Sequence, residues 1–151
     1  MQRLVKGDMS SLYDLDFCLW TEAAARGLRE GRLAELDLDH LAEEIEDLGN
    51  RNAREVRSRI TQILEHLLKL KLARGVILEY NRGGWRASIV RERQELDALF
   101  EESPSLRRLV GPELLEACYQ RAAERIAAEY RVETPARCPF SEQEVLVELV
   151  S

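Results

Sequence analysis

The sequence predicts an all-α protein, a helical bundle of four main helices plus two short ones, organised on one long helix. Apolar residues recur at steps of three and four through most of the chain, whereas no segment alternates convincingly with the period of two that a strand requires. The chain of 151 residues is also long enough to bury a core without disulfides. We therefore expect one helical domain over residues 1–151.

The long helix is expected over residues 38–74. Asp37 stands where a carboxylate accepts the free N–H groups of a first helical turn, and Leu36 and Leu41 occupy the positions of a hydrophobic staple. One apolar stripe then follows helical spacing; its members are Leu38, Leu41, Ile45, Leu48, Asn52, Val56, Ile60, Ile63, Leu67 and Leu70.

Gly49-Asn50 is the weak point of this helix. Glycine costs about 1 kcal/mol relative to alanine inside a helix, so the stretch could also form two helices that meet at a hinge. The stripe keeps its phase across this point, because Leu48, Asn52 and Val56 are each one turn apart. We therefore expect one continuous helix.

Two further helices are expected on either side of the long one. The first runs from Ser10 or Ser11 to about Glu30, with an apolar face broad enough to place it in the core and Gly31 as its stop. Residues 76–84 are expected to be irregular and to reverse the chain, because Asn81-Arg82-Gly83-Gly84 is typical of a turn. The next helix would then begin at Trp85.

The last third predicts three helical segments. Ser103-Pro104 reads as a cap followed by proline at the first helical position, which opens a short turn. A main helix is expected from Glu113 to about Tyr130, ended by Thr134-Pro135, and Ser141 with Glu144 could form the capping box of a short final helix.

Composition restricts the function classes. The net charge is −6, yet residues 51–100 carry 11 basic and 6 acidic side chains between two acidic thirds. We interpret the basic middle as the complement of those acidic thirds rather than as a nucleic-acid surface. The three cysteines are widely spaced, without a Cys-x-x-Cys pair, and no apolar run approaches the ~20 residues of a membrane span. A cytoplasmic protein without membrane contact is expected.

The strongest candidate site is the acidic start of the long helix, where His40 is followed by Glu43, Glu44 and Asp47. The spacing of His40 and Glu43 resembles the Glu-x-x-His ligands of di-iron bundles. No second pair with this spacing exists, and in a continuous helix Glu44 and His66 would stand about 33 Å apart. We therefore predict no metal and no cofactor, and interpret the carboxylates as a solvated first turn favoured by the helix dipole.

Three other residues complete the candidate set: His66, Trp85 and Arg93. His66 is expected to be half-buried and hydrogen-bonded to a neighbouring helix, rather than to act as a general base. Trp85 is interpreted as a core residue at a helix start and Arg93 as a surface ion-pair residue. The alternative is that Arg82, Arg86 and Arg93 bind a phosphate group or nucleic acid. No nucleophile has an activating motif, so an enzyme is not indicated.

Several short motifs together resemble a known family. They are Leu12-Tyr13-Asp14-Leu15-Asp16-Phe17, Trp20, Leu36-Asp37, residues 40–49 (HLAEEIEDLG), His66-Leu67-Leu68-Lys69, Trp85-Arg86-Ala87-Ser88-Ile89, Ser103-Pro104-Ser105-Leu106 and Cys138-Pro139-Phe140. Their order and spacing resemble the bacterial domain-of-unknown-function 29 family over nearly the whole chain. In that family a residue such as serine often precedes the tryptophan, where this chain has Gly84. The resemblance implies a helical fold and no established activity.

The hypothesis that follows is a helical interaction or accessory module that self-associates or binds a protein partner. It depends on the long apolar stripe, which extends beyond what the shorter helices can cover. A metal-binding or hydrolytic enzyme that uses the carboxylate and histidine cluster is the alternative from another class.

Overall fold

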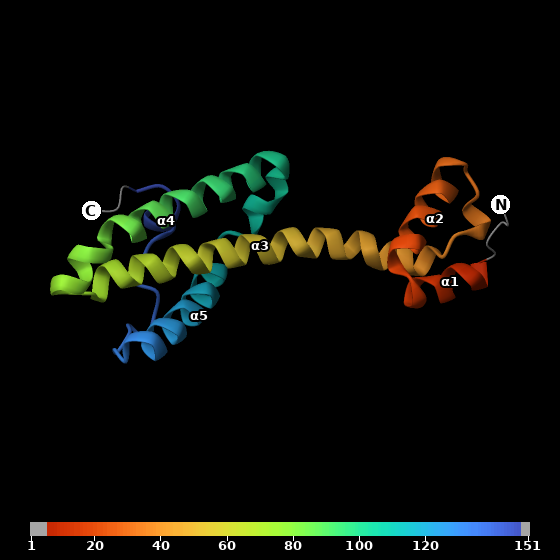
Figure 1. Ribbon diagram of the computed structural model, residues 1–151. Helices are drawn as coiled ribbons and strands as arrows, with labels where there is room; N and C mark the ends of the chain where they lie inside the picture. Colours follow the sequence, from red (N-terminus) through yellow and green to blue (C-terminus); the bar gives the residue numbers. More distant parts are fainter. Residues whose placement is uncertain (1–5, 149–151) are drawn as a thin grey trace. The chain divides into compact units, whose positions relative to one another are not determined.

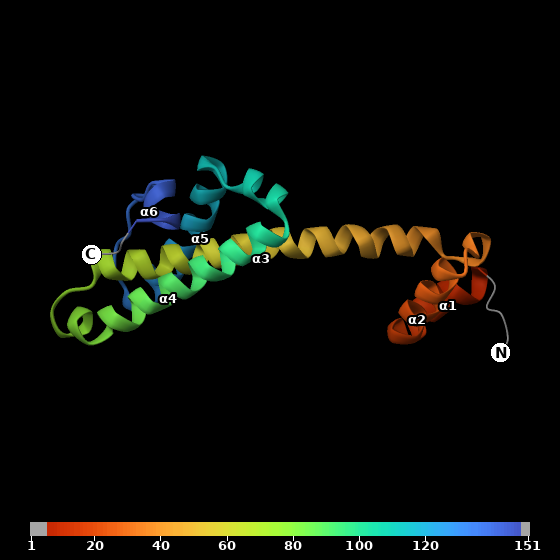
Figure 2. The same ribbon diagram turned by 90° about the horizontal axis from the view of Figure 1, so that it is seen from above.

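The all-α prediction is confirmed by a computed structural model that describes residues 6–148. Within this range the chain forms six α-helices and two 3₁₀ helices, and no strand (Figures 1 and 2). The two helical segments beyond the predicted number come from a break in the first helix and from a short 3₁₀ turn before the long helix. By its contacts the chain divides into two compact units, residues 1–50 and 51–151. A single domain over 1–151 stays a prediction.

The first unit contains α1 (Lys6–Leu15), α2 (Phe17–Arg29), the 3₁₀ helix η1 (Leu33–Glu35) and the first turns of α3 (Leu38–Leu72). Its core is small. Met9, Trp20 and Ala24 are buried, and partly buried side chains pack against them, among them Tyr13 and Leu41. A core of this size derives much of its stability from the fit of a few large side chains.

The predicted single helix from Ser10 or Ser11 to Glu30 is wrong, because the chain breaks at Asp16. Asp16 is extended, and its carboxylate accepts the Leu19 N–H at 3.0 Å as the N-cap of α2. An aspartate competes with helical backbone bonds and is favoured at a cap, which accounts for the break. The expected burial of the whole apolar face is wrong as well, since Leu15 and Leu19 remain exposed.

Gly31 ends α2 as predicted. It adopts a left-handed conformation with φ +70°, which glycine reaches without the steric penalty of a Cβ atom. The Gly31 N–H bonds the Leu28 carbonyl at 3.2 Å and the Arg32 N–H bonds the Gly27 carbonyl at 2.9 Å. This pair of bonds is the Schellman motif and satisfies the last free carbonyls of the helix.

The prediction of a continuous long helix is confirmed. α3 runs from Leu38 to Leu72 without interruption at Gly49. At its start the Asp37 carboxylate accepts the His40 N–H at 3.4 Å. The stripe divides by burial: Val56, Ile60, Ile63 and Leu67 are buried, whereas Leu38, Ile45 and Leu48 are exposed.

In the second unit the remaining turns of α3 pack with α4 (Gly75–Glu102), η2 (Pro104–Leu109), α5 (Pro112–Tyr130) and α6 (Glu142–Leu146). The fully buried side chains come from α3, α4, α5 and α6; the largest of them are Ile60, Ile63, Leu64, Leu68, Ile89, Leu96, Tyr119, Ile126 and Val145. They form one continuous hydrophobic core, which holds this unit together.

The expected irregular segment over residues 76–84 is wrong, because α4 already begins at Gly75. The chain reverses over Ala73 and Arg74 instead, and the Arg74 guanidinium donates to the carbonyls of Lys71 at 2.7 Å and Ala73 at 2.8 Å. Gly75, with φ +58°, allows the sharp change of direction. Burial of Trp85 and the apolar residues after it outweighs the helix cost of Gly83-Gly84, about 1 kcal/mol for each glycine.

The last third follows its predicted order with small differences. Pro104 opens η2 as predicted, although the Ser103 side chain makes no capping hydrogen bond. α5 ends at Tyr130, as predicted, but the residue that follows its end is Arg131 in a left-handed conformation with φ 53°, not the predicted Thr134-Pro135. The predicted capping box of Ser141 and Glu144 is confirmed at the start of α6.

Candidate functional site

A cluster of polar and aromatic side chains surrounds His40 in the first unit. The Tyr13 ring of α1 stacks on the His40 ring of α3, with centroids 3.8 Å apart and an interplanar angle of 11°. The Tyr13 hydroxyl donates to Glu44 Oε1 at 2.6 Å, and His40 Nδ1 is hydrogen-bonded to the buried Asp37 carboxylate. These bonds fix both ring orientations.

Electrostatics in this cluster favour the protonated forms of both rings. The hydrogen bond to Asp37 raises the pKa of His40 above its ordinary value. The hydrogen bond to Glu44 raises the pKa of Tyr13 to about 12, so that this hydroxyl stays protonated at neutral pH. The raised pKa values leave less of either side chain in the deprotonated form that a general base requires, and the single hydroxyl proton of Tyr13 is already donated to Glu44.

The other predicted carboxylates lie apart from these bonds. Glu43 and Asp47 are exposed on α3, whereas Glu44 is partly buried against Tyr13. Nowhere in residues 6–148 do three or more His, Cys, Asp or Glu side chains gather in a way that could hold a metal ion. Of the acidic candidates, the structure therefore brings only Glu44 into the cluster around His40.

Trp20 is a buried neighbour of this cluster that the sequence analysis did not assign to a site. Its ring meets the Tyr13 ring edge to face, with centroids 5.0 Å apart. The indole Nε1 is fully buried and has no hydrogen-bond partner within the described part of the chain. Both Trp20 and Tyr13 belong to the motifs that carry the family resemblance, which is the sequence feature that could have indicated them.

His66 lies in the second unit and is half-buried, as expected. Burial is the main cause of its lowered pKa, so that the neutral ring is favoured. Its Nδ1 atom is buried without a hydrogen-bond partner among residues 6–148, so the expected hydrogen bond to a neighbouring helix is not made by this atom.

Arg93 holds the last helix in place. Its guanidinium donates three hydrogen bonds to backbone carbonyls at the end of α6: Nε to Val145 at 2.9 Å, Nη2 to Glu144 at 2.6 Å and Nη1 to Glu148 at 2.8 Å. The interpretation as a surface ion-pair residue is therefore wrong. A cation at a helix C-terminus is favoured by the helix dipole, and these bonds use three of the five N–H donors of the guanidinium.

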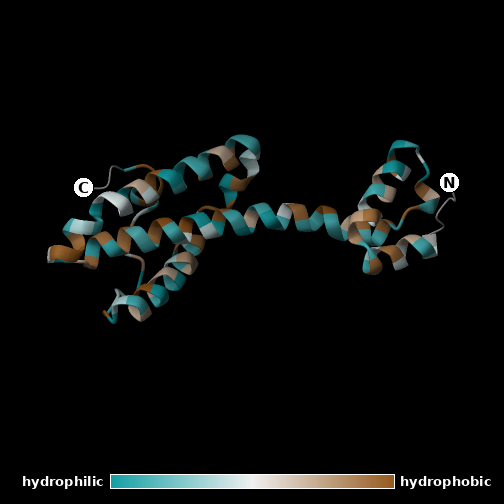
Figure 3. Cartoon of the chain, in the orientation of Figure 1, coloured by the Kyte–Doolittle hydropathy of each residue, from teal (hydrophilic) through white to brown (hydrophobic). Residues whose placement is uncertain are grey.

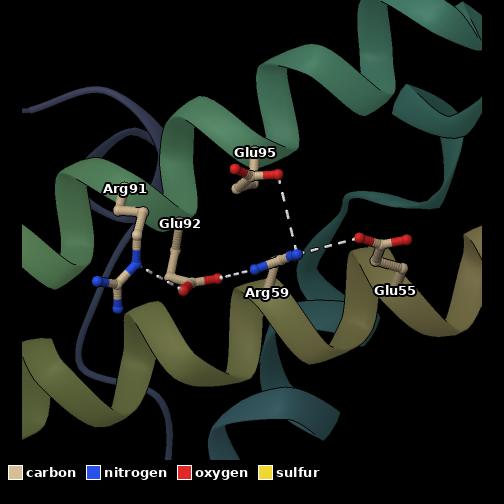
Figure 4. Close-up of polar contacts among 5 residues, drawn as sticks. All are labelled: Glu55, Arg59, Arg91, Glu92 and Glu95. Carbon is tan, nitrogen blue, oxygen red and sulfur yellow. Dashed lines mark hydrogen bonds and ion pairs between the residues drawn. The ribbon is translucent and has the colours of Figure 1, made fainter.

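A second arginine, Arg59 of α3, forms an ion-pair network with α4 (Figure 4). Its Nη1 atom lies 2.9 Å from Oε2 of Glu92, whose side chain is only 4% exposed, and Nη2 lies 3.2 Å from Glu55 and 3.9 Å from Glu95. The hydrogen bond to Glu92 is the largest contribution to the raised pKa of Arg59. No sequence pattern predicted this network, because the apolar residues around Glu92 give no sign of a buried carboxylate.

Trp85 is buried in the second unit, as predicted, but it lies in the interior of α4 and not at a helix start. It also lines a cavity of about 270 Å³ together with residues from α3 and α5.

The family model described as "Domain of unknown function DUF29" matches residues 12–149. The chain belongs to this family. No curated protein and no solved structure matches it. Among the described residues, no helix of this DUF29 chain is both long and apolar enough to span a membrane.

The candidate residues of the DUF29 chain thus fall into two separate groups. His40, Glu43, Glu44 and Asp47 belong to the first unit, and His66, Trp85 and Arg93 to the second. A joint metal or catalytic site required the chain to fold back at Gly49, and α3 is continuous there. A functional role for any of these residues stays a prediction.

Proposed function

We propose that this DUF29 chain is a helical interaction module that pairs with a second copy of itself through the first half of α3. The main observation in support is the exposure of two large side chains of the apolar stripe, Ile45 at 64% and Leu48 at 57%. The same stripe is buried further along the helix by the chain's own residues. Exposed apolar stripes on a helix are typical of surfaces that bind another helix.

The spacing along this half of the stripe supports a helix as the partner, although Leu41 is partly buried against the first unit's own core and Asn52 is only partly exposed. Leu38, Leu41, Ile45, Leu48 and Asn52 follow one another at steps of three, four, three and four, which is the alternation of the two core positions in a coiled coil. Small residues, Ala42 and Gly49, flank the stripe on one side and allow a second helix to approach closely.

Neighbouring apolar side chains enlarge this surface. Phe17 is 48% exposed, and the centroids of its ring and the Tyr13 ring lie 5.7 Å apart. The Tyr13 hydroxyl in turn donates a hydrogen bond to Glu44, which precedes Ile45 in the sequence. A stripe of two heptads is short for a stable interface, since such interfaces bury about 800 Å² on each partner. The expected dimer is therefore weak unless exposed apolar side chains such as Phe17 add to the interface.

Charge along α3 favours an antiparallel arrangement of the two copies. Residues 39–47 contain five carboxylates and no lysine or arginine, whereas residues 51–59 contain one glutamate and four arginines, of which Arg59 is already paired within its own chain. Hydrophilic and hydrophobic residues are mixed along α3 in Figure 3. Antiparallel helices that cross near Leu48 place the acidic stretch of one copy along the basic stretch of the other. A parallel pair would align the acidic stretches and lose this attraction.

Sedimentation of the full chain at micromolar concentration tests the proposal. We expect the wild type to form a dimer and Ile45→Glu or Leu48→Glu to be a folded monomer, because a charge at an exposed position breaks the pairing but not the fold. Val76→Glu is the matched control, since Val76 is 80% exposed but lies on α4. A monomeric wild type, or a dimer that only Val76→Glu disrupts, refutes the proposed surface.

Salt dependence tests the orientation. An antiparallel pair should dissociate more readily when NaCl is raised from about 0.05 M to about 0.5 M. Salt screens the attraction between the acidic stretch of one copy and the basic stretch of the other. A parallel pair would respond in the opposite direction, since salt would then screen a repulsion.

A reducing cytoplasm is part of the proposal. All three cysteines are free thiols, and burial raises the pKa of Cys118 and Cys138, which disfavours the reactive thiolate. Fractionation of the native host, followed by thiol labelling, would test this location.

A further inference from the structure

The cavity beside Trp85 lies where three helices of the second unit end or begin. Its apolar walls include Leu72 at the end of α3, Trp85 of α4, and Ile126 and Tyr130 of α5. Its volume of about 270 Å³ is close to the lower end of the range for small-molecule sites, roughly 300–1,000 Å³. The space suits a short aliphatic chain or a single ring rather than a large cofactor.

All the charged side chains that line this cavity are cations. Lys69 and Arg74 are its ionisable cations, and no carboxylate side chain is among its lining residues. Two cations beside an apolar wall attract a molecule with a negative head and an apolar body. A cationic ligand would be repelled by these two cations, and a strongly polar ligand would not gain binding energy from the apolar wall.

Both cations can reach a ligand without disturbing the fold. The Lys69 ammonium lies 3.6 Å from Glu129, whose side chain is 54% exposed, and 5.7 Å from the centroid of the Tyr130 ring. An ion pair with so exposed a partner contributes little stability and is readily exchanged. Arg74 uses Nη1 for both of its backbone bonds, which leaves Nε and Nη2 as further donors.

We infer that this cavity is a binding site for a small amphipathic carboxylate. The apolar body contacts Trp85, Leu72 and Ile126, and the carboxylate is bound by Lys69 with Arg74 as the second cation. This site lies in the second unit and uses none of the residues of the proposed pairing surface, so either proposal can fail while the other stands.

Octanoate is the probe, and the two tryptophans of the chain, Trp20 and Trp85, provide the readout. In a ¹H–¹⁵N spectrum each indole N–H gives one resonance, which Trp20→Phe assigns. We expect octanoate to shift the Trp85 resonance in a saturable manner and to leave that of Trp20 unchanged. Octylamine, with the same chain and the opposite charge, should bind at least about tenfold more weakly.

Lysine variants separate a site from general hydrophobic adsorption. Lys69→Gln should weaken octanoate binding about tenfold, as expected for the loss of a charge-assisted hydrogen bond. Lys71→Gln, an exposed lysine two residues away that does not line the cavity, should leave binding unchanged. Arg74→Gln gives a second test if Lys69→Gln does not fold. A linear, non-saturating shift, equal binding of octylamine, or equal effects of the two lysine variants overturns the inference.

Discussion

The Arg59–Glu92 ion pair between α3 and α4 gives the sharpest test of what stabilises the second unit. The Glu92 side chain is 4% exposed and that of Arg59 is 26% exposed. Arg59→Ala therefore leaves a buried carboxylate without its main partner, a change that typically costs 3–5 kcal/mol. Arg91 remains at 3.7 Å from Glu92, so we expect a loss at the lower end, about 3 kcal/mol.

Urea unfolding followed by Trp85 fluorescence in a Trp20→Phe background measures this loss in the unit concerned. If the free energy of unfolding falls by about 2 kcal/mol per molar urea, a loss of about 3 kcal/mol lowers the unfolding midpoint by about 1.5 M urea. Arg54→Ala, an exposed arginine on the same helix, is the matched control and should change stability by less than about 0.5 kcal/mol.

The double variant Arg59→Met/Glu92→Leu discriminates the physical cause. If the cost of Arg59→Ala comes from an uncompensated buried charge, removing both charges should restore stability to within about 1 kcal/mol of the wild type. A double variant as unstable as Arg59→Ala would refute this reasoning, because the lost stability would then come from packing by the arginine stem.

Three further predictions concern a backbone position, the two histidines and the last helix. Gly49→Ala should stabilise the chain by about 1 kcal/mol, since α3 is helical there and an added Cβ atom meets nothing within 4 Å. Gly31→Ala should destabilise it, because Gly31 has φ +70°, which alanine adopts only with strain. Thermal unfolding of both variants tests this pair. In an NMR titration, one histidine should titrate above the ordinary pKa of about 6.5 and the other below it. The contribution of His40 to stability is complete below about pH 6.5 and is lost as pH rises through its raised pKa. The contribution of His66 is present above about pH 6.5 and is lost as pH falls through its lowered pKa. His40→Gln and His66→Gln assign the two titration curves, and pKa shifts in the reverse order would contradict both effects. Arg93→Gln should release α6 and cost about 2 kcal/mol, seen as faster hydrogen exchange of the buried Val145 amide; unchanged protection would show that apolar packing alone holds the helix.

The candidate site was only partly predictable. His40 and Glu44 were selected by their helical spacing, and both lie in one cluster. Tyr13, which contacts both of them, comes from another helix, and its hydroxyl partner depends on packing that no local pattern encodes. The role of Arg93 at the end of α6 likewise joins residues about fifty positions apart.

Local chemistry in the sequence determined the all-α class, the continuity of α3, the glycine stop at Gly31 and the capping box at Ser141, because each depends on residues within a few positions of one another. Tertiary structure decided that residues 75–84 are helical, and that Ile45 is exposed while Ile60 on the same stripe is buried. Helical periodicity shows which side of a helix is apolar, but only the other elements determine how much of that side is covered.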